Sequence, residues 1–244
     1  MPALKGIFFD LDDTLYSCTH FARQARRNAV KAMISVGLDF PEDRLMEELE
    51  QVTEEFSSNS EKHFDKLLLR IPRAAWEGLN PAVLVAAAVV GYHNTKMRDM
   101  FPYEDAVDLL ERLARTKVVR GIITAGIPMK QAEKIVRLGL VKYLSPNSIF
   151  ITEQIGITKR NPRLYQLACE SQGLKPAETM YVGDRADYDI DIPNSIGMIT
   201  VHSKRSGKYS DVAPQTKPAF VINNFYDLMD ILQNEFGIPV LKRG

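Results

Sequence analysis

The sequence predicts an α/β protein: a doubly wound parallel sheet, with a helical domain inserted after the first strand. Two observations carry this prediction. Short apolar segments rich in β-branched and aromatic residues alternate with helical patterns over most of the 244 residues, which is typical of strand–helix–strand units. Several of these segments lack strict alternation of apolar and polar residues, as do strands buried on both faces of a parallel sheet.

The strand and helix candidates follow one another along the chain. The strands are expected at residues 6–9, 118–123, 148–151, 180–182 and 198–201, with a weaker sixth at 219–222. Helical patterns cover residues 104–115, 129–137 and 162–172 between them. This order favours a Rossmann-like core.

The segment after the first strand breaks this rhythm. From about residue 19 to about residue 98 one helical pattern follows another, and the fourth begins at Pro81, because proline suits a first helical turn. An insertion this long is not a simple crossover connection. We therefore expect a core domain of residues 1–17 and 99–244 and a separate helical domain of residues 18–98.

Composition excludes several classes of protein. Lys plus Arg (31) balance Asp plus Glu (31), which argues against a nucleic-acid partner held by bulk charge. The longest apolar run, residues 81–90, is far short of the ~20 residues that a membrane helix needs. Cys18 and Cys169 make neither a disulfide framework nor a metal site, so a cytoplasmic location is expected. The oligomeric state stays open.

Acidic residues follow the first expected strand, in the order Asp10-Leu11-Asp12-Asp13-Thr14. In open α/β sheets, ligands bind beyond the carboxyl ends of the strands. Three carboxylates in four residues repel one another unless a cation neutralises them, and oxygen-rich clusters suit Mg²⁺. A solvated acidic turn is an equally good interpretation of this segment taken alone.

Three further strand ends carry polar residues. Thr124-Ala125-Gly126 opens a helix, where free backbone N–H groups attract anions, although Thr124 could simply cap that helix. Lys159 follows the third strand and could neutralise phosphate, although most single lysines lie on the surface. Asp184 ends the fourth strand, with Asp189 soon after. Since all four groups fall at one edge of the sheet, a common site is the better interpretation.

With these residues in view, the sequence resembles the haloacid dehalogenase superfamily of hydrolases. Its four motifs match residues 10–14, Thr124, Lys159 and 183–184 with Asp189, and the inserted helices resemble the family's cap domain. Within the superfamily, residues 92–96 and 183–185 resemble the archaeal glyceraldehyde-3-phosphate phosphatase group. One departure is visible, because Arg160 stands where the family has proline after the motif lysine.

The resemblance implies a role for each motif residue. Asp10 is the expected nucleophile, forming an aspartyl-phosphate, and Asp12 the general acid and then the general base. Asp10, the backbone carbonyl of Asp12, and Asp184 are the expected Mg²⁺ ligands, with Asp189 behind them or orienting Lys159. The expected phosphoryl-binding groups are the side chains of Thr124 and Lys159 and the N–H groups of Ala125 and Gly126.

The expected function is therefore a Mg²⁺-dependent phosphatase acting on a small phosphate ester, such as the triose phosphate glyceraldehyde 3-phosphate or a sugar phosphate. A 2-haloacid dehalogenase would need neither Mg²⁺ nor the second acid, so Asp12 and Asp184 count against it. A phosphomutase stays open. A catalytically silent binding module should lack a catalytic position, and none is missing. The cap should set specificity, with residues 93–96 as polar contributors.

Overall fold

The chain consists of two compact units. The computed structural model describes residues 3–57, 60, 62–205, 207–209 and 212–240. Residues Met1–Thr19 and Phe101–Gly244 form a core unit, and His20–Met100 form a helical unit.

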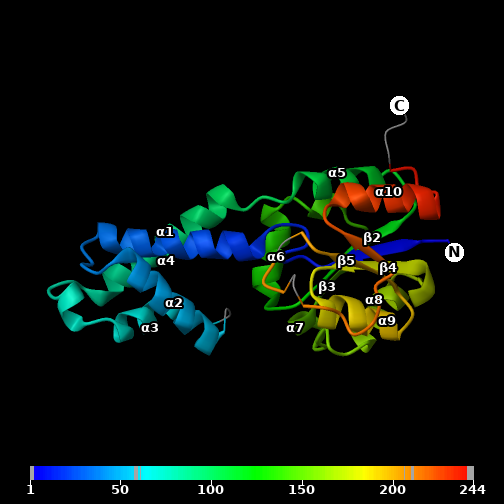
Figure 1. Cartoon of the computed structure of the whole chain (residues 1–244). Helices are drawn as coiled ribbons and strands as arrows, with labels where there is room; N and C mark the ends of the chain where they lie inside the picture. The colour runs from blue at the N-terminus through cyan, green and yellow to red at the C-terminus, as the bar shows by residue number, and fades with distance from the viewer. Residues whose placement is uncertain (1–2, 58–59, 61, 206, 210–211, 241–244) are drawn as a thin grey trace. The chain divides into compact units, whose positions relative to one another are not determined.

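The core unit is built on a six-stranded parallel sheet (Figure 1), which confirms the predicted fold class. The strands stand in the order β3-β2-β1-β4-β5-β6. Their bounds are β1 (Gly6–Phe9), β2 (Val119–Thr124), β3 (Ile149–Ile151), β4 (Thr179–Gly183), β5 (Ile199–Ser203) and β6 (Phe220–Ile222). The weakest strand expected from the sequence is thus present as β6.

Helices cover both faces of this sheet. They are α5 (Glu104–Leu113), α6 (Pro128–Arg137), α7 (Thr152–Ile155), α8 (Arg163–Ser171), α9 (Asp191–Ser195) and α10 (Phe225–Phe236). Figure 1 shows α5 and α10 on one face and α8 and α9 on the other. Successive residues of β1 point to opposite faces, so Phe9 packs against Phe225 of α10 while Phe8 packs against Phe150.

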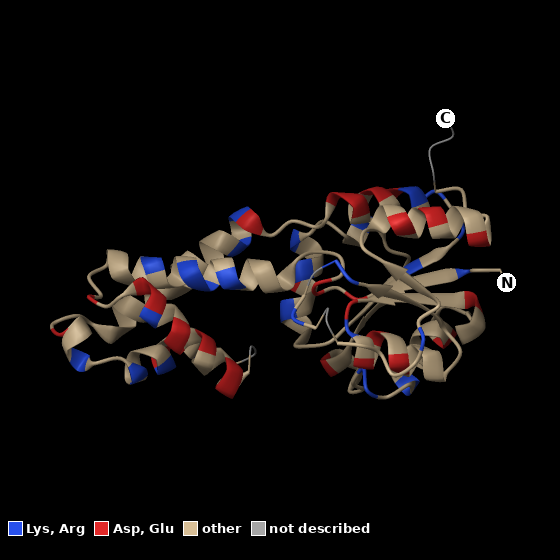
Figure 2. Ribbon diagram, viewed as in Figure 1, with Lys and Arg blue, Asp and Glu red and all other residues tan. Residues whose placement is uncertain are grey.

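The topology of the sheet directs attention to the ends of β1 and β4. The strands β2 and β3 lie on one side of β1, and β4, β5 and β6 lie on the other. The strand order therefore reverses between β1 and β4, and ligands bind at such a switch point in open α/β sheets. Figure 2 shows acidic segments where the strands run out into loops at this edge.

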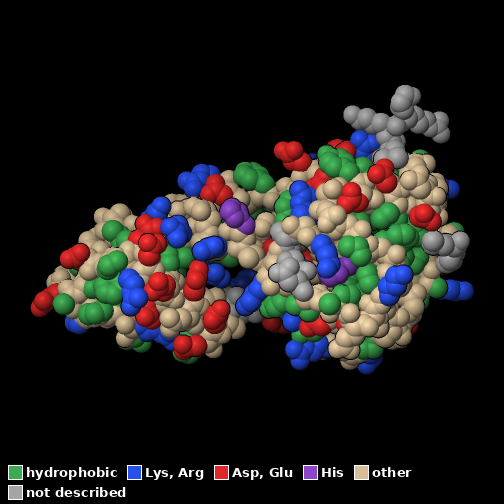
Figure 3. Space-filling model, viewed as in Figure 1, with side chains coloured by type: hydrophobic (Ala, Val, Ile, Leu, Met, Phe, Trp, Pro, Cys, Tyr) green, Lys and Arg blue, Asp and Glu red, His purple; other side chains and the backbone are tan. Residues whose placement is uncertain are grey.

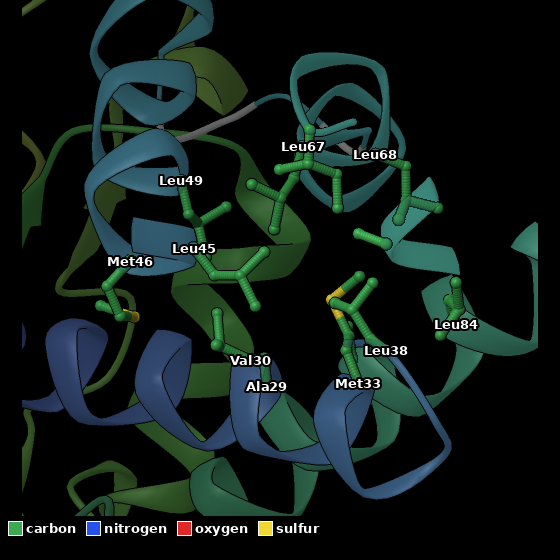
Figure 4. Packing of buried hydrophobic residues seen from close by; sticks show 13 residues of the cluster. Ala29, Val30, Met33, Leu38, Leu45, Met46, Leu49, Leu67, Leu68 and Leu84 are labelled. Atoms are coloured by element: carbon green, nitrogen blue, oxygen red, sulfur yellow. The ribbon is translucent and has the colours of Figure 1, made fainter. Parts of the chain in front are cut away.

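The helical unit has its own hydrophobic core. It contains most of α1 (Cys18–Ser35), followed by α2 (Glu42–Phe56), α3 (His63–Arg70), a 3₁₀ helix at Arg73–Trp76 and α4 (Pro81–Asp99). Figure 4 shows leucine and methionine side chains from these helices pointing toward one another. At the start of α4, the Asn80 side chain accepts a hydrogen bond from the Ala82 N–H at 2.9 Å, and Pro81 occupies the first turn as predicted.

The surface carries charges of both signs. Acidic and basic side chains are interspersed over the face of the molecule in Figure 3. Among the described residues, no helix combines the length and apolar character that crossing a membrane requires.

Two leucines of α3 offer a matched test of the helical core. Leu67 is fully buried in the cluster, whereas Leu69 is 84% exposed. We expect Leu67→Ala to lower the free energy of unfolding of this unit by about 2–5 kcal/mol, because truncation leaves a cavity, and Leu69→Ala to change it by less than about 0.5 kcal/mol. Urea unfolding followed by the fluorescence of Trp76, the single tryptophan of the chain, measures both. Equal effects would contradict the packing described here.

Candidate active site

Asp10 lies at the carboxyl end of β1, in a buried ionic cluster. Its backbone N–H donates to the carbonyl oxygen of Val182 in β4 at 2.8 Å, which ties the two central strands together where they end. The Nζ of Lys159 donates to Asp10 Oδ1 at 2.5 Å and to Asp189 Oδ1 at 2.9 Å. All three side chains are buried. The interpretation of Lys159 as a surface lysine is therefore wrong.

A metal ion could be held beside this lysine. Asp10, Asp184 and Asp189 each bring a carboxylate oxygen within 4.8 Å of the others. Asp189 is the most engaged of the three, since Oδ1 accepts from Lys159 and Oδ2 from the Arg185 N–H at 3.1 Å. Asp10 and Asp184 thus have the oxygens left for a cation, and carboxylate oxygens are ligands for hard divalent cations.

Local backbone structure places Asp189 in this cluster. It belongs to a π-helical turn at Ala186–Ile190, directly after β4. A Cβ at Gly183 would lie 2.4 Å from the Asp189 Cγ, so only glycine lets this carboxylate approach the strand so closely. The π turn and the glycine together bring Asp189 back to Lys159.

The cluster carries more negative charge than Lys159 neutralises. Burial raises the pKa of Asp10, and Asp189 adds to this, while Lys159 opposes it. Burial likewise raises the pKa of Asp184, with further contributions from Asp10 and Asp189. Burial alone would lower the pKa of Lys159, but the two carboxylates that it contacts raise it. A bound cation would relieve this repulsion, and the residues therefore fit a metal site.

The other two acids of the first motif have different environments. Lys134 Nζ donates to both carboxylate oxygens of Asp12, each at 2.7 Å. Burial would raise the pKa of Asp12, but the Lys134 cation and its hydrogen bonds outweigh this and lower it. Asp13 accepts from the N–H and hydroxyl of Thr19 at 2.8 and 2.6 Å, and so caps α1. Since Asp10 and Asp13 are buried, the solvated acidic turn is excluded.

Two partners of Asp12 were not identified from the sequence. Lys134 and Gln131 lie three residues apart on α6, so they share a face of that helix, and α6 follows the second motif directly. That spacing was the available signal. What the sequence did not show is that this face is turned toward Asp12.

The segment after β2 has the features of an anion site. Thr124 is the last residue of β2 and its buried hydroxyl has no hydrogen-bond partner within the described part of the chain. The residue that precedes α6 is Ile127, so Thr124 does not cap that helix. The Gly126 N–H donates to the Thr152 hydroxyl at 3.1 Å. A ligand would have to replace this bond in order to use the Gly126 N–H.

The departure at Arg160 leaves the buried lysine in place. Arg160 is exposed, and its Nε donates to the Tyr188 hydroxyl at 2.7 Å. The neighbouring Lys159 still reaches Asp10. Arginine at the family's proline position therefore adds an outward contact.

Residues 93–96, the polar segment expected to contribute to specificity, differ in burial. Thr95 is buried within the helical unit, where its hydroxyl accepts from Asn28 Nδ2 and donates to the Gly91 carbonyl, both at 2.9 Å. His93 and Asn94 are exposed on α4. Lys96 is half-buried. Thr95 therefore has a packing role, and the other three residues of the segment have surface that a ligand could contact.

Comparison with known proteins adds to this geometry. Residues 4–197 match the family of haloacid dehalogenase-like hydrolases. The glyceraldehyde 3-phosphate phosphatase of Methanopyrus kandleri is 42% identical over 94% of this chain and 97% of its own. The enzyme of that name from Methanocaldococcus jannaschii is 36% identical over 95% and 98%. A Bacillus subtilis protein described as a putative haloacid dehalogenase-type (HAD) hydrolase, with its structure solved bound to magnesium, has the same fold. The TM-score is 0.63, with 17% identity over 94% of this chain and 99% of that protein.

The crowding of carboxylates predicts that the metal-free protein is strained at this site. The folded-state pKa of Asp184 is raised, so ionising it costs stability, and the cost grows as pH rises above its ordinary value of about 4. We expect Asp184→Asn to raise the free energy of unfolding in EDTA by at least about 1 kcal/mol near pH 8, since each pKa unit corresponds to about 1.4 kcal/mol, and by less near pH 5.

Thermal melting of both proteins, with EDTA and with Mg²⁺, checks this expectation. Added Mg²⁺ should raise the melting temperature of the parent protein, because a ligand that binds only the folded state stabilises it, and should affect Asp184→Asn much less. A variant that melts below the parent in EDTA near pH 8 would contradict the proposed repulsion.

Proposed function

Since this chain belongs to the haloacid dehalogenase-like hydrolase family, we propose that it hydrolyses a small phosphate monoester through a phosphorylated Asp10, with Mg²⁺ as its metal. The membership confirms the resemblance that the motifs carry. One observation supports the mechanism above all others. Asp10 sits in a buried cluster with Lys159 and Asp184, while Asp12, two residues away, is held by a separate set of partners.

In the first step, an Asp10 carboxylate oxygen attacks phosphorus and the bond from phosphorus to the ester oxygen breaks. Lys159 donates to Asp10 Oδ1, which orients the carboxylate for the attack. Asp12 has to enter this step in its protonated form, and it gives that proton to the departing oxygen, so that an alcohol leaves in place of an alkoxide and Asp12 becomes a carboxylate. The product on the enzyme is an aspartyl-phosphate.

In the second step, water attacks phosphorus and releases inorganic phosphate from Asp10. Asp12, ionised since the first step, takes the proton of that water; the lowered pKa of its carboxyl group keeps it in this ionised form. Thr124 offers its unpaired hydroxyl to a phosphoryl oxygen throughout, together with the Ala125 N–H and, once released from Thr152, the Gly126 N–H. Asp189 keeps Lys159 in place.

Asp10, the backbone carbonyl of Asp12, and Asp184 are the groups that we propose hold Mg²⁺. The ion would supply positive charge that offsets the phosphoryl oxygens as negative charge redistributes during transfer. The chain's own contribution is the cluster of buried carboxylates that brings these ligands together.

Glyceraldehyde 3-phosphate is the substrate that we propose, because two relatives that match nearly the whole chain carry that name. The four motifs recognise only the phosphoryl group and the metal, which all phosphate esters share. Discrimination between esters therefore has to come from other residues, and the helical unit (His20–Met100) is the part of the chain that the catalytic motifs leave free for it.

A phosphate-release assay tests this function. The protein should release phosphate from glyceraldehyde 3-phosphate with Mg²⁺ or Mn²⁺ and lose this activity in EDTA, while Asp10→Asn, which has no nucleophile, should be inactive yet folded. Halide release from a 2-haloacid without metal and without phosphatase activity would favour the dehalogenase alternative. Isomerisation of a sugar phosphate, without net release of phosphate, would favour a phosphomutase.

The role of Asp12 gives a second test. Asp12→Asn removes the proton donor, and general acid–base catalysis contributes about 10²–10⁴-fold. Hydrolysis of an alkyl phosphate should fall by about this factor, whereas p-nitrophenyl phosphate, whose leaving group needs no proton, should lose less. Steady-state kcat values on the two esters measure the difference. Equal losses on both would argue against proton donation by Asp12.

A further inference from the structure

The carboxylate of Asp12 is surrounded by donors from the core unit. Lys134 Nζ lies 2.7 Å from both Asp12 oxygens. The Tyr16 hydroxyl donates to Oδ1 at 2.5 Å, and the Gln131 Nε2 donates to Oδ2 at 3.2 Å. Each oxygen thus accepts two hydrogen bonds. This set is separate from the cluster around Asp10, since its cation comes from α6 and not from the loop that carries Lys159.

Gln131 is itself fixed to the segment that follows β2. The side chain is buried, and its Nε2 also donates to the Ala125 carbonyl at 2.8 Å. A Cβ at Gly126 would lie 2.8 Å from this nitrogen. Any larger residue at position 126 would therefore displace the Gln131 side-chain amide from its present place. The amide therefore ties Asp12 to the proposed phosphoryl-binding segment, and the two are held in one arrangement.

Lys134 holds its partner in a defined orientation. Its side chain is only 17% exposed, and its equal distances to the two oxygens place it on the axis of the carboxylate. An unrestrained Asp12 on a loop would rotate about its side-chain bonds, and ordering it at the moment of reaction would cost conformational entropy. A general acid or base contributes only when it is within hydrogen-bond reach of the proton that it transfers.

We propose that Lys134 and Gln131 are positioning residues for proton transfer by Asp12. The inference rests on the proposed function. Lys134 and Gln131 hold the Asp12 carboxyl group in one plane beside the phosphoryl-binding segment. In the first step the protonated Asp12 donates to the leaving oxygen, and in the second the ionised Asp12 accepts from the attacking water. In each step this contact replaces one of the hydrogen bonds that the carboxylate accepts here. When the proton has moved from Asp12 to the departing oxygen, the Lys134 cation stabilises the carboxylate that remains.

The decisive variant is Lys134→Met, which keeps the length of the side chain and removes its charge. We expect kcat on glyceraldehyde 3-phosphate to fall at least about 10-fold, a part of the about 10²–10⁴-fold that acid–base catalysis contributes, and kcat on p-nitrophenyl phosphate to fall less. KM and the Mg²⁺ requirement should change little, because Lys134 contacts the side-chain carboxylate of Asp12, which is not among the proposed metal ligands. Lys134→Arg should restore most of the loss.

Two further variants serve as controls. Arg137→Met removes a cation from the same helix, one that is paired with Glu133 at 2.8 Å, and should leave both esters unaffected. Combining Lys134→Met with Asp12→Asn should give no further loss beyond Asp12→Asn, because residues that act through one another are not additive. If Lys134→Met folds poorly, Gln131→Met, which removes the second α6 contact, is measured in its place.

The outcomes separate this inference from the function on which it rests. If the parent protein hydrolyses neither ester, the proposed function fails and the inference fails with it. Suppose that the parent is active but kcat of Lys134→Met falls by the same factor on both esters, or that the loss from Lys134→Met adds in full to the loss from Asp12→Asn. In either case the function stands and the positioning role is wrong. A selective loss on the alkyl ester that Lys134→Arg restores supports it.

Discussion

The contact of Lys159 with Asp10 and Asp189 is the interaction on which the core site depends. A buried lysine is costly unless it is paired, and here it has two carboxylate partners. In turn it brings a positive charge to two acids of the carboxylate cluster, Asp10 and Asp189. Sheet and loops must therefore bring one lysine and three acids to a single point, and the topology reversal between β1 and β4 makes that possible.

The carboxylates that suit this site for binding a cation also lower the stability of the metal-free protein, because they repel one another. Asp10, Asp184 and Asp189 carry more negative charge than Lys159 neutralises, and a bound cation would offset the excess. Asp12 is arranged in the opposite way, because its carboxylate is fully satisfied by the chain. The first motif, residues 10–14, thus contains one carboxylate with an oxygen free for a cation and another whose oxygens already accept hydrogen bonds from the chain.

Much of this could be predicted from the sequence. The strands were recognisable from short apolar segments, and Asp10, Lys159, Asp184 and Asp189 could be expected together because each follows a strand that ends at one edge. The partners of Asp12 were not predictable in this way, since Gln131 and Lys134 look like ordinary polar residues of an amphipathic helix. The burial of Thr95 was also missed, because its hydrogen bonds to the helical core satisfy a polar side chain that looked exposed.

The cap that Asp13 places on α1 has a consequence for how this protein can change in evolution. Asp13 adopts a left-handed backbone conformation, with φ of 57°, and both its oxygens are occupied by Thr19. The number of residues between the catalytic acids and the first turn of α1 is therefore fixed, and an insertion or deletion there would move the acids and the helix start out of register. Changes in chain length are better tolerated in the connections between α2, α3 and α4, which lie in the other unit, because loops accept insertions and deletions more readily than the elements they connect.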